Sequence, residues 1–209
     1  MTDLATLVSA VEAGDRTTAV AVTQSAIDDG IAPQEILDTM SRAMEVVGGK
    51  FSRNELFVPE MLISARAMKE ATALLEPLLV KAGIKPEHTA VIGTTKGDLH
   101  DIGKNLVGMM WKGAGIAVVD LGTNVSAEQF VSAAKAHQAS LIGVSALLTT
   151  TMVGIEEVVA AVREAGLPTR VLVGGAPLTP EYAASIGADG YAPDAASAVE
   201  VAKGLISRL

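Results

Sequence analysis

The sequence predicts an α/β protein in two parts, an all-α four-helix bundle followed by a Rossmann-like (flavodoxin-like) parallel sheet of five strands. In the first 83 residues, the apolar spacing and the positions of glycine and proline indicate helices only. From Thr89 onward, short apolar runs alternate with amphipathic helical stretches, and the runs begin roughly 20 to 30 residues apart, the length of a βα unit. We therefore predict a helical domain at residues 1–83, a linker at 84–88 and an α/β domain at 89–209.

Glycines and prolines divide the helical half into four predicted helices. Its apolar residues recur at spacings of three and four, which is typical of amphipathic helices. Pro33 suits the first turn of the third helix. The fourth helix is expected from Glu60 to about Lys81, with a bend near Pro77, because proline removes a backbone donor. The predicted breaks between helices are Gly14, Gly30, Gly48-Gly49 and the segment Phe51–Pro59.

Five short apolar runs in the second half are the predicted strands. Ser126 followed three residues later by Gln129 is a capping box that opens the second helix of this half. Gly166 and Pro168 close the third. The predicted strands are Ala90–Gly93, Ile116–Leu121, Leu141–Leu147, Val171–Val173 and Gly190–Ala192.

Composition narrows the classes of function. The chain has 209 residues with 16 Lys and Arg against 24 Asp and Glu, a formal net charge of −8, which disfavours a nucleic-acid partner. The absence of cysteine excludes disulfides, thiolate-zinc sites and thiol nucleophiles. The start, Met1-Thr2-Asp3-Leu4, resembles no secretory signal, and no apolar run reaches about 18 residues. We expect a cytoplasmic protein without a membrane partner.

The segment Gly97–Asn105 carries the most specific chemistry. It places His100, one of three histidines, after an apolar run and two residues from Asp98. A neutral imidazole is a good metal ligand, and a carboxylate that accepts the proton of its other nitrogen orients it. In open parallel sheets, ligands bind beyond the carboxyl ends of the strands. The segments expected there are Thr94–Gly103, Gly122–Val125, Ser145–Thr151 and Gly174–Pro177.

Other interpretations of this loop are weaker. A phosphate-binding P-loop would need four residues between its glycines, whereas five separate Gly97 from Gly103, and Asn105 replaces the magnesium-binding hydroxyl. The dinucleotide-binding glycine motif is absent from the first turn. Taken alone, a histidine in this position is more often a hydrogen-bonded polar residue than a ligand. His88 and His137 are interpreted as surface residues.

Taken as one unit, the motif is far more specific. Asp98-x-His100-x-x-Gly103, followed by Ser145-x-Leu147 and then Gly174-Gly175, resembles the B12-binding domain of the cobalamin-dependent methyltransferases. The longer flanking matches are similar to the small corrinoid proteins of methyltransferase systems and to the cobalamin-binding region of methionine synthase. The helical half takes part through Val47-Gly48, Phe51, Glu55 and Phe57–Met61, so that the resemblance covers nearly the whole chain.

The resemblance implies a corrinoid whose own base is displaced, with His100 as the lower axial ligand of its cobalt. Asp98 would hydrogen-bond His100, and Ser145 would hydrogen-bond Asp98, which forms a relay beside the metal. No residue is implied as catalytic. Thr95 is polar where an apolar residue is expected, which affects strand packing only.

The resemblance also implies which other residues contact the cofactor. Asp101 and Ile102 belong to the ligand loop, and Thr149 adds a polar contact. The helical half would cap the upper face of the corrin through Met61, with Phe57 and Leu62 beside it, whereas Glu55 and Glu60 are interpreted as helix-end charges. A slot for the displaced nucleotide tail would be lined by Gly103, Leu147, Gly174 and Gly175.

The function implied is that of a methyl carrier, which is not catalytic alone. The cobalt of bound cobalamin would accept a methyl group from a substrate-specific methyltransferase and pass it to a second methyltransferase, with tetrahydrofolate or a thiol as acceptor. A reductive activator is a further implied partner. Two alternatives are a cobalamin-binding sensor or regulatory module, and the cobalamin subunit of a mutase, which would leave the helical cap unexplained.

Overall fold

The computed structural model describes residues 2–83 and 86–209. Two residues of the predicted linker, Ile84 and Lys85, lie outside the described residues. The chain forms two compact units, one built mainly from residues up to Pro86 and the other mainly from Glu87 onward. Each unit has its own core.

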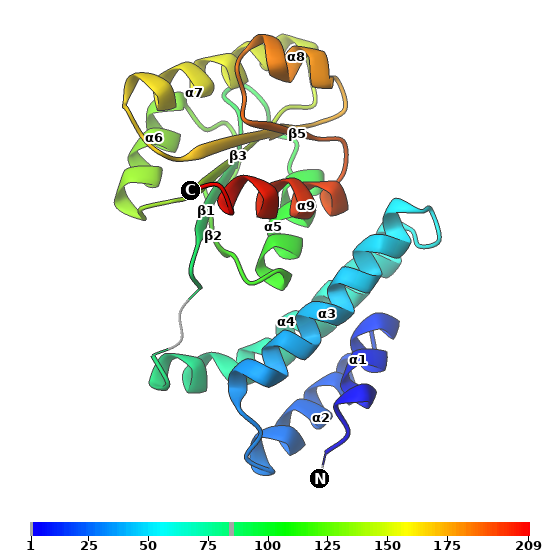
Figure 1. The fold of residues 1–209 in the computed structure, drawn as a ribbon. Coiled ribbons are helices and arrows are strands. Elements are labelled where there is room, and N and C mark those ends of the chain that lie inside the picture. Colours follow the sequence, from blue (N-terminus) through cyan, green and yellow to red (C-terminus); the bar gives the residue numbers. More distant parts are fainter. Residues whose placement is uncertain (1, 84–85) are drawn as a thin grey trace. The chain divides into compact units, whose positions relative to one another are not determined.

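The helical unit contains the four expected helices within residues 2–83 (Figure 1). Asp3 caps the first helix through a hydrogen bond from the backbone N–H of Ala5, and Gly14 ends it in the left-handed conformation, with φ of 69°. Asp15 caps the second by accepting from the N–H of Thr18. The helices are α1 (Leu4–Ala13), α2 (Arg16–Asp28), α3 (Pro33–Ser52) and α4 (Val58–Lys81).

The third helix differs from the expectation at its end. Helix α3 continues through Gly48-Gly49 to Ser52, and Asn54 then adopts the left-handed conformation with φ of 58°. Glycine inside a helix costs about 1 kcal/mol relative to alanine. The complete burial of Met40 and Val47 in α3 outweighs that cost. The expected helix end at Gly48-Gly49 is therefore wrong.

The fourth helix begins two residues earlier than expected, at Val58. The carboxylate of Glu60 accepts a hydrogen bond of 2.8 Å from the backbone N–H of Phe57 just before the helix, which confirms Glu60 as a helix-end charge. Pro77 lies inside α4, which continues to Lys81. Among the described helices, none has the length and apolarity needed to cross a membrane.

Within residues 86–209, the α/β unit has a five-stranded parallel sheet in the order β2-β1-β3-β4-β5. All five predicted strands are confirmed, with ends shifted by a few residues. The capping box of Ser126 and Gln129 at the start of helix α6 (Ala127–Ala136) is also confirmed. The strands are β1 (Thr89–Thr94), β2 (Ala117–Asp120), β3 (Leu141–Ser145), β4 (Arg170–Gly174) and β5 (Gly190–Ala192).

Helices cover both faces of this sheet (Figure 1). On one face, Trp111 of α5 donates a hydrogen bond of 3.1 Å to the carbonyl of Ala198 in α9, and its ring packs on Gly143 of β3. On the other face, α6, α7 and α8 share an apolar core that includes Phe130 and Ile155. The helices are α5 (Ile102–Gly113), α6 (Ala127–Ala136), α7 (Met152–Glu164), α8 (Pro180–Ser185) and α9 (Ala195–Ile206).

The order of the strands places a switch point between β1 and β3. The connection from β1 leads outward to β2, whereas β3 continues in the other direction to β4, so the chain leaves the carboxyl ends of β1 and β3 in opposite directions. Such a point leaves a crevice where ligands bind. The loop after β1 carries Asp98 and His100, and the loop after β3 continues into a 3₁₀ turn at Thr149–Thr151.

Candidate functional site

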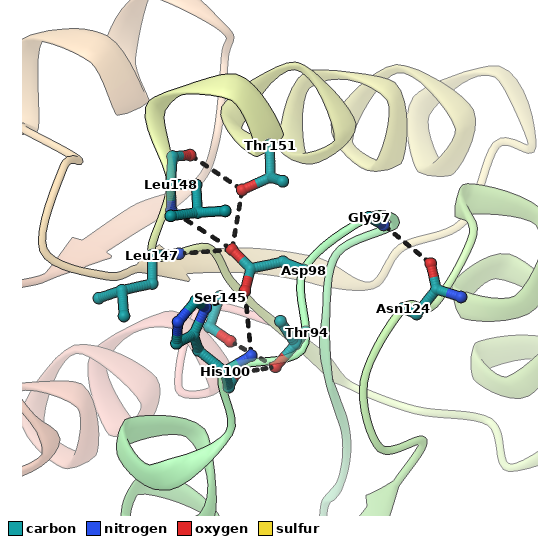
Figure 2. Close-up of polar contacts among 9 residues, drawn as sticks. All are labelled: Thr94, Gly97, Asp98, His100, Asn124, Ser145, Leu147, Leu148 and Thr151. Carbon is teal, nitrogen blue, oxygen red and sulfur yellow. Dashed lines mark hydrogen bonds and ion pairs between the residues drawn. The ribbon is translucent and has the colours of Figure 1, made fainter.

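The centre of the site is a hydrogen-bonded pair, His100 and Asp98. The ring Nδ1 of His100 lies 2.7 Å from Oδ1 of Asp98, which also accepts the backbone N–H of His100 at 3.0 Å (Figure 2). Because an ionised carboxylate only accepts, Nδ1 carries the hydrogen, and Nε2 keeps its lone pair for a metal. The Asp98 side chain is 0% exposed and that of His100 is 52% exposed. A buried group therefore orients an imidazole that solvent can reach.

The second carboxylate oxygen of Asp98 is held by the loop after β3. Oδ2 accepts hydrogen bonds from the backbone N–H of Leu147 at 2.8 Å and of Leu148 at 3.3 Å, and from the Thr151 hydroxyl at 2.8 Å (Figure 2). Burial alone would raise the pKa of Asp98. The hydrogen bonds from Leu147, His100 and Thr151 outweigh burial and hold the pKa of Asp98 well below its ordinary value. The aspartate is thus ionised at neutral pH.

The hydroxyl that meets Asp98 differs from the expectation. Thr151 makes this contact, whereas the Ser145 hydroxyl lies 3.0 Å from that of Thr94. Thr94 donates to the backbone carbonyl of His100 at 2.8 Å, so Ser145 must be the donor in its pair with Thr94. The reason is position. Ser145 is the last residue of β3 and pairs with Thr94 across the sheet, and the 3₁₀ turn is needed to direct a later hydroxyl toward Asp98.

Sequence reasoning missed the role of Thr151. The signal was present as three consecutive threonines just after β3, but strand patterns do not say which hydroxyl a following turn directs inward. Thr151 is buried, and its hydroxyl oxygen also lies 2.9 Å from the carbonyl oxygen of Leu148, so that its single hydrogen is shared between this carbonyl and Asp98. Thr149, predicted as a cofactor contact, is exposed in the same turn.

The residues that follow the histidine form the start of α5. Asp101 accepts hydrogen bonds from Asn105, at 3.0 Å from its side chain and 2.7 Å from its backbone N–H. Ile102 is 78% exposed, and Leu99 on the other side of His100 is 73% exposed. A methyl group added at Gly103 would meet nothing within 4 Å. Apolar, exposed residues therefore lie on both sides of His100 in the sequence, and the space beside Gly103 is open.

The loop after β3 adds to this surface. Leu147 and Leu148 are both partly exposed, while their backbone N–H groups are bonded to Asp98. Exposed apolar side chains grouped in this way are typical of ligand or partner sites. Leu99, Leu147 and Leu148 come from the two loops at the switch point, and Ile102 is the first residue of α5.

The paired glycines after β4 allow two parts of the backbone to approach each other. Gly175 has φ of 131°, and a Cβ there would overlap the carbonyl oxygen of Ala146. A Cβ at Gly174 would lie 2.9 Å from the carbonyl oxygen of Ala192. These two glycines are thus explained by contact with the chain itself, whereas Gly103 presents open space.

The predicted cap residues of the helical unit fall into different environments. Met61 is 0% exposed, because it lies one and two helical turns before Ala65 and Met68 on the buried face of α4. Its side chain is buried in the structure, and its contact with a cofactor stays a prediction. Phe57 is 70% exposed. Glu55 forms an ion pair with Arg53 at 2.8 Å.

The donor set restricts the kind of metal group that fits. Within residues 2–83 and 86–209, no group of three or more His, Cys, Asp or Glu side chains could hold a metal ion. A metal bound by His100 must therefore bring most of its own ligands. A planar macrocycle that carries its metal meets this requirement, and the apolar part of its face suits the exposed leucine and isoleucine side chains. The residues present fit a corrinoid.

Comparison with known proteins gives the same identification. The sequence profiles of two B12 binding domains match the chain, one at residues 88–200 and the other at residues 4–76. A corrinoid protein of Desulfitobacterium hafniense strain Y51 is 40% identical over 211 residues, which cover 97% of this chain and 96% of the relative. Dimethylamine corrinoid protein 3 of Methanosarcina acetivorans is 42% identical over 179 residues, 84% of each chain.

Solved structures agree with the sequence relatives. A cobalamin-binding protein from D. hafniense DCB-2 has a TM-score of 0.82 and 27% identity, with 98% of this chain and 99% of the other covered. The methanol:cobalamin methyltransferase complex of Methanosarcina barkeri contains a chain with a TM-score of 0.88 and 29% identity, with 99% and 80% covered. On this similarity over nearly its whole length, the chain belongs to the family of B12-binding corrinoid proteins.

Proposed function

We propose that this protein is a methyl carrier that binds cobalamin through its α/β unit, with His100 as the lower axial ligand. The observation that carries the proposal is the half-exposed imidazole of His100, whose Nδ1 is fixed by the buried carboxylate of Asp98. When bound, the corrinoid supplies a cobalt centre that accepts a methyl group and gives it up.

The chain's own residues hold the neutral imidazole in one tautomer and one orientation. Asp98 accepts the Nδ1 hydrogen and so fixes the orientation of the ring, as carboxylates do for metal-bound histidines. Thr151 and the backbone N–H of Leu147 hold the carboxylate from its other side. The low pKa of Asp98 keeps its carboxylate ionised and therefore an acceptor for the Nδ1 hydrogen.

The apolar surface around His100 is the proposed binding surface for the macrocycle. Ile102, Leu147 and the backbone at Gly103 would exclude water from its lower face and admit its nucleotide tail. Asp101 supports this surface by holding the first turn of α5. Contacts at Ser145, Thr149, Gly174 and Gly175 belong to the same proposal.

We propose domain boundaries at residues 1–83 for the helical unit, 84–88 for the linker and 89–209 for the α/β domain. The helical unit would cover the reactive upper face of the cofactor. Phe57 is the side chain that supports this role, because it is aromatic and 70% exposed at the start of α4. A large exposed apolar group is costly in water and is typical of a surface that meets a ligand or partner.

The proposed partners are a substrate-specific methyltransferase, a second methyltransferase and a reductive activator. One support is a relative named as a dimethylamine corrinoid protein. A second is a similar chain in the solved structure of a methanol:cobalamin methyltransferase complex. The methyl-transfer chemistry of such a carrier lies in the cofactor, so the choice of methyl donor would lie in the partner.

The proposal is tested by methyl transfer to the loaded protein. Cobalamin-loaded protein is reduced and mixed with a methyltransferase for methanol or a methylamine, with a carbon-14-labelled methyl donor. We expect label on the protein only when cofactor and methyltransferase are both present, and release of the label on addition of a second methyltransferase with its acceptor. Loaded protein that acquires no label from any partner, but binds a regulator when cobalamin is added, would indicate a sensor instead.

A further inference from the structure

Asn124, in the loop after β2, makes two hydrogen bonds to the start of the loop that carries His100. The side-chain Oδ1 of Asn124 accepts a hydrogen bond of 2.8 Å from the N–H of Gly97 (Figure 2). The backbone N–H of Asn124 donates to the carbonyl of Asp98 at 3.0 Å. Asn124 is thus bonded to two consecutive residues of the histidine loop, as the acceptor for Gly97 and as the donor to Asp98.

The backbone at this contact has an unusual conformation that suits asparagine. Asn124 has φ of 55° and Gly97 has φ of 82°, both in the left-handed region. Most residues other than glycine avoid that region, and asparagine is among those that enter it most readily. The contact therefore requires a residue that tolerates positive φ and also carries a short acceptor.

The loop that carries Asn124 is itself anchored. The N–H of Val125 donates to the carbonyl of Thr94 at 2.9 Å, and the N–H of Thr94 donates to the carbonyl of Gly122 at 2.9 Å. The N–H of Gly122 donates to Asp120, whose carboxylate lies 2.6 Å from the buried ammonium of Lys104. These bonds hold the loop against β1.

The same anchor reaches the far end of the histidine-bearing segment. Lys104 lies in the first turn of α5, four residues after His100. Asn124 holds the segment at Asp98, and Asp120 holds it at Lys104. One short stretch of chain, from Asp120 to Asn124, is therefore attached to both ends of the segment that carries the metal ligand.

We propose that Asn124 is a positioning residue for His100, acting through Asp98. Asp98 and His100 are two residues apart in one turn, so the direction of the Gly97 and Asp98 peptide groups sets where the carboxylate meets Nδ1. Ligand geometry has to hold within about 0.5 Å for full function, and two hydrogen bonds at the start of the turn supply that restraint. This inference rests on the proposed ligation of cobalt by His100.

The test compares Asn124→Gly, Asn124→Asp and the control Gln138→Gly. Glycine keeps the positive φ but removes the acceptor, whereas aspartate keeps an acceptor for the N–H of Gly97. Gln138 is an exposed amide residue with φ of 49° in the same unit. It precedes the amino end of β3, whereas the site lies at the carboxyl ends of the strands. It controls for an amide-to-glycine change at a left-handed position.

The first readout is coordination in the full-length protein loaded with cob(II)alamin. Nitrogen-15 labelling of histidine separates protein ligation from the cofactor's own base in the EPR spectrum. At one fixed pH we expect Asn124→Gly to lower the ratio of histidine-bound to histidine-free cobalt by about 10-fold, the size of effect typical of residues that orient a ligand. Asn124→Asp should restore the ratio, and Gln138→Gly should match wild type.

The second readout needs no cofactor. Amide hydrogen exchange at Gly97 in the unloaded protein should be faster in Asn124→Gly than in wild type, and protected in Asn124→Asp. Faster exchange with unchanged histidine coordination would overturn the positioning role while leaving the proposed function intact. Wild-type protein that binds cobalamin without histidine coordination would overturn the proposed ligation, and the role of Asn124 with it.

Discussion

The hydroxyl of Thr151 lies 2.8 Å from Oδ2 of Asp98, while the other carboxylate oxygen lies 2.7 Å from Nδ1 of His100. A single buried carboxylate therefore connects the loop after β3 to the proposed metal ligand. Because Thr151 and Asp98 are separated by 53 residues, this connection exists only in the folded α/β unit.

Histidine ligation is the first prediction. Protein loaded with cob(II)alamin should show an EPR coupling pattern that changes when its histidines are labelled with nitrogen-15, because Nε2 of His100 is the nitrogen left free by Asp98. His100→Ala should abolish the change, whereas His137→Ala, an exposed histidine at the end of α6, should preserve it. A pattern insensitive to labelling would show that the cofactor keeps its own base.

The hydroxyl next to Asp98 gives a second prediction. Thr151→Val removes a donor to the carboxylate while keeping the branched shape, and should weaken histidine coordination by about 10-fold, the lower end of the roughly 10- to 100-fold range for groups that support a metal ligand. Ser145→Ala should have a smaller effect on coordination, since the Ser145 hydroxyl bonds Thr94 instead. The ratio of histidine-bound to histidine-free cobalt measures both. A larger loss in Ser145→Ala would contradict the arrangement described.

Acid unfolding provides a third prediction. The folded pKa of Asp98 lies below its unfolded value of about 3.9, so its ionised form stabilises the fold above that pH. This contribution should be lost as pH falls from about 5 toward the folded pKa. Asp98→Asn should therefore flatten the pH dependence of the free energy of unfolding below about pH 5, measured by urea titration. Identical slopes in the two proteins would remove Asp98 as a source of acid sensitivity.

The Lys104 and Asp120 pair yields a fourth prediction. The Lys104 side chain is 1% exposed, whereas that of Asp120 is 45% exposed. Asp120→Ala leaves a buried cation without its carboxylate and should lower the free energy of unfolding by about 3 kcal/mol. Lys104→Met leaves only a half-exposed carboxylate and should cost about 1 kcal/mol. Urea unfolding of the unloaded protein measures both, and the reverse order would contradict the burial described.

The helical unit gives a fifth prediction. If Phe57 shields the reactive face, Phe57→Ala should speed the oxidation of reduced, loaded protein by air, followed by absorption spectroscopy. Val80→Ala is the matched control, because Val80 is also 70% exposed on α4 but near its other end. Equal oxidation rates in Phe57→Ala and wild type would assign the helical unit a docking role.

Much of the architecture could be predicted from local patterns. The spacing of apolar runs determined the five parallel strands, and the Ser126 and Gln129 pair determined the start of α6, since both signals depend on residues close in sequence. The Gly97–Asn105 motif likewise determined the pairing of His100 with Asp98, two residues apart. Such features follow from backbone geometry over a few residues.

Only the tertiary structure decided which distant groups meet. It directed Thr151 rather than Ser145 toward Asp98, because the sheet register uses Ser145 to pair with Thr94 and the 3₁₀ turn then reorients the chain. It also continued α3 through Gly48-Gly49 and buried Met61, since packing energy between helices exceeds local helix preferences. The sequence by itself determined the ligand loop, whereas long-range packing decided which groups support it.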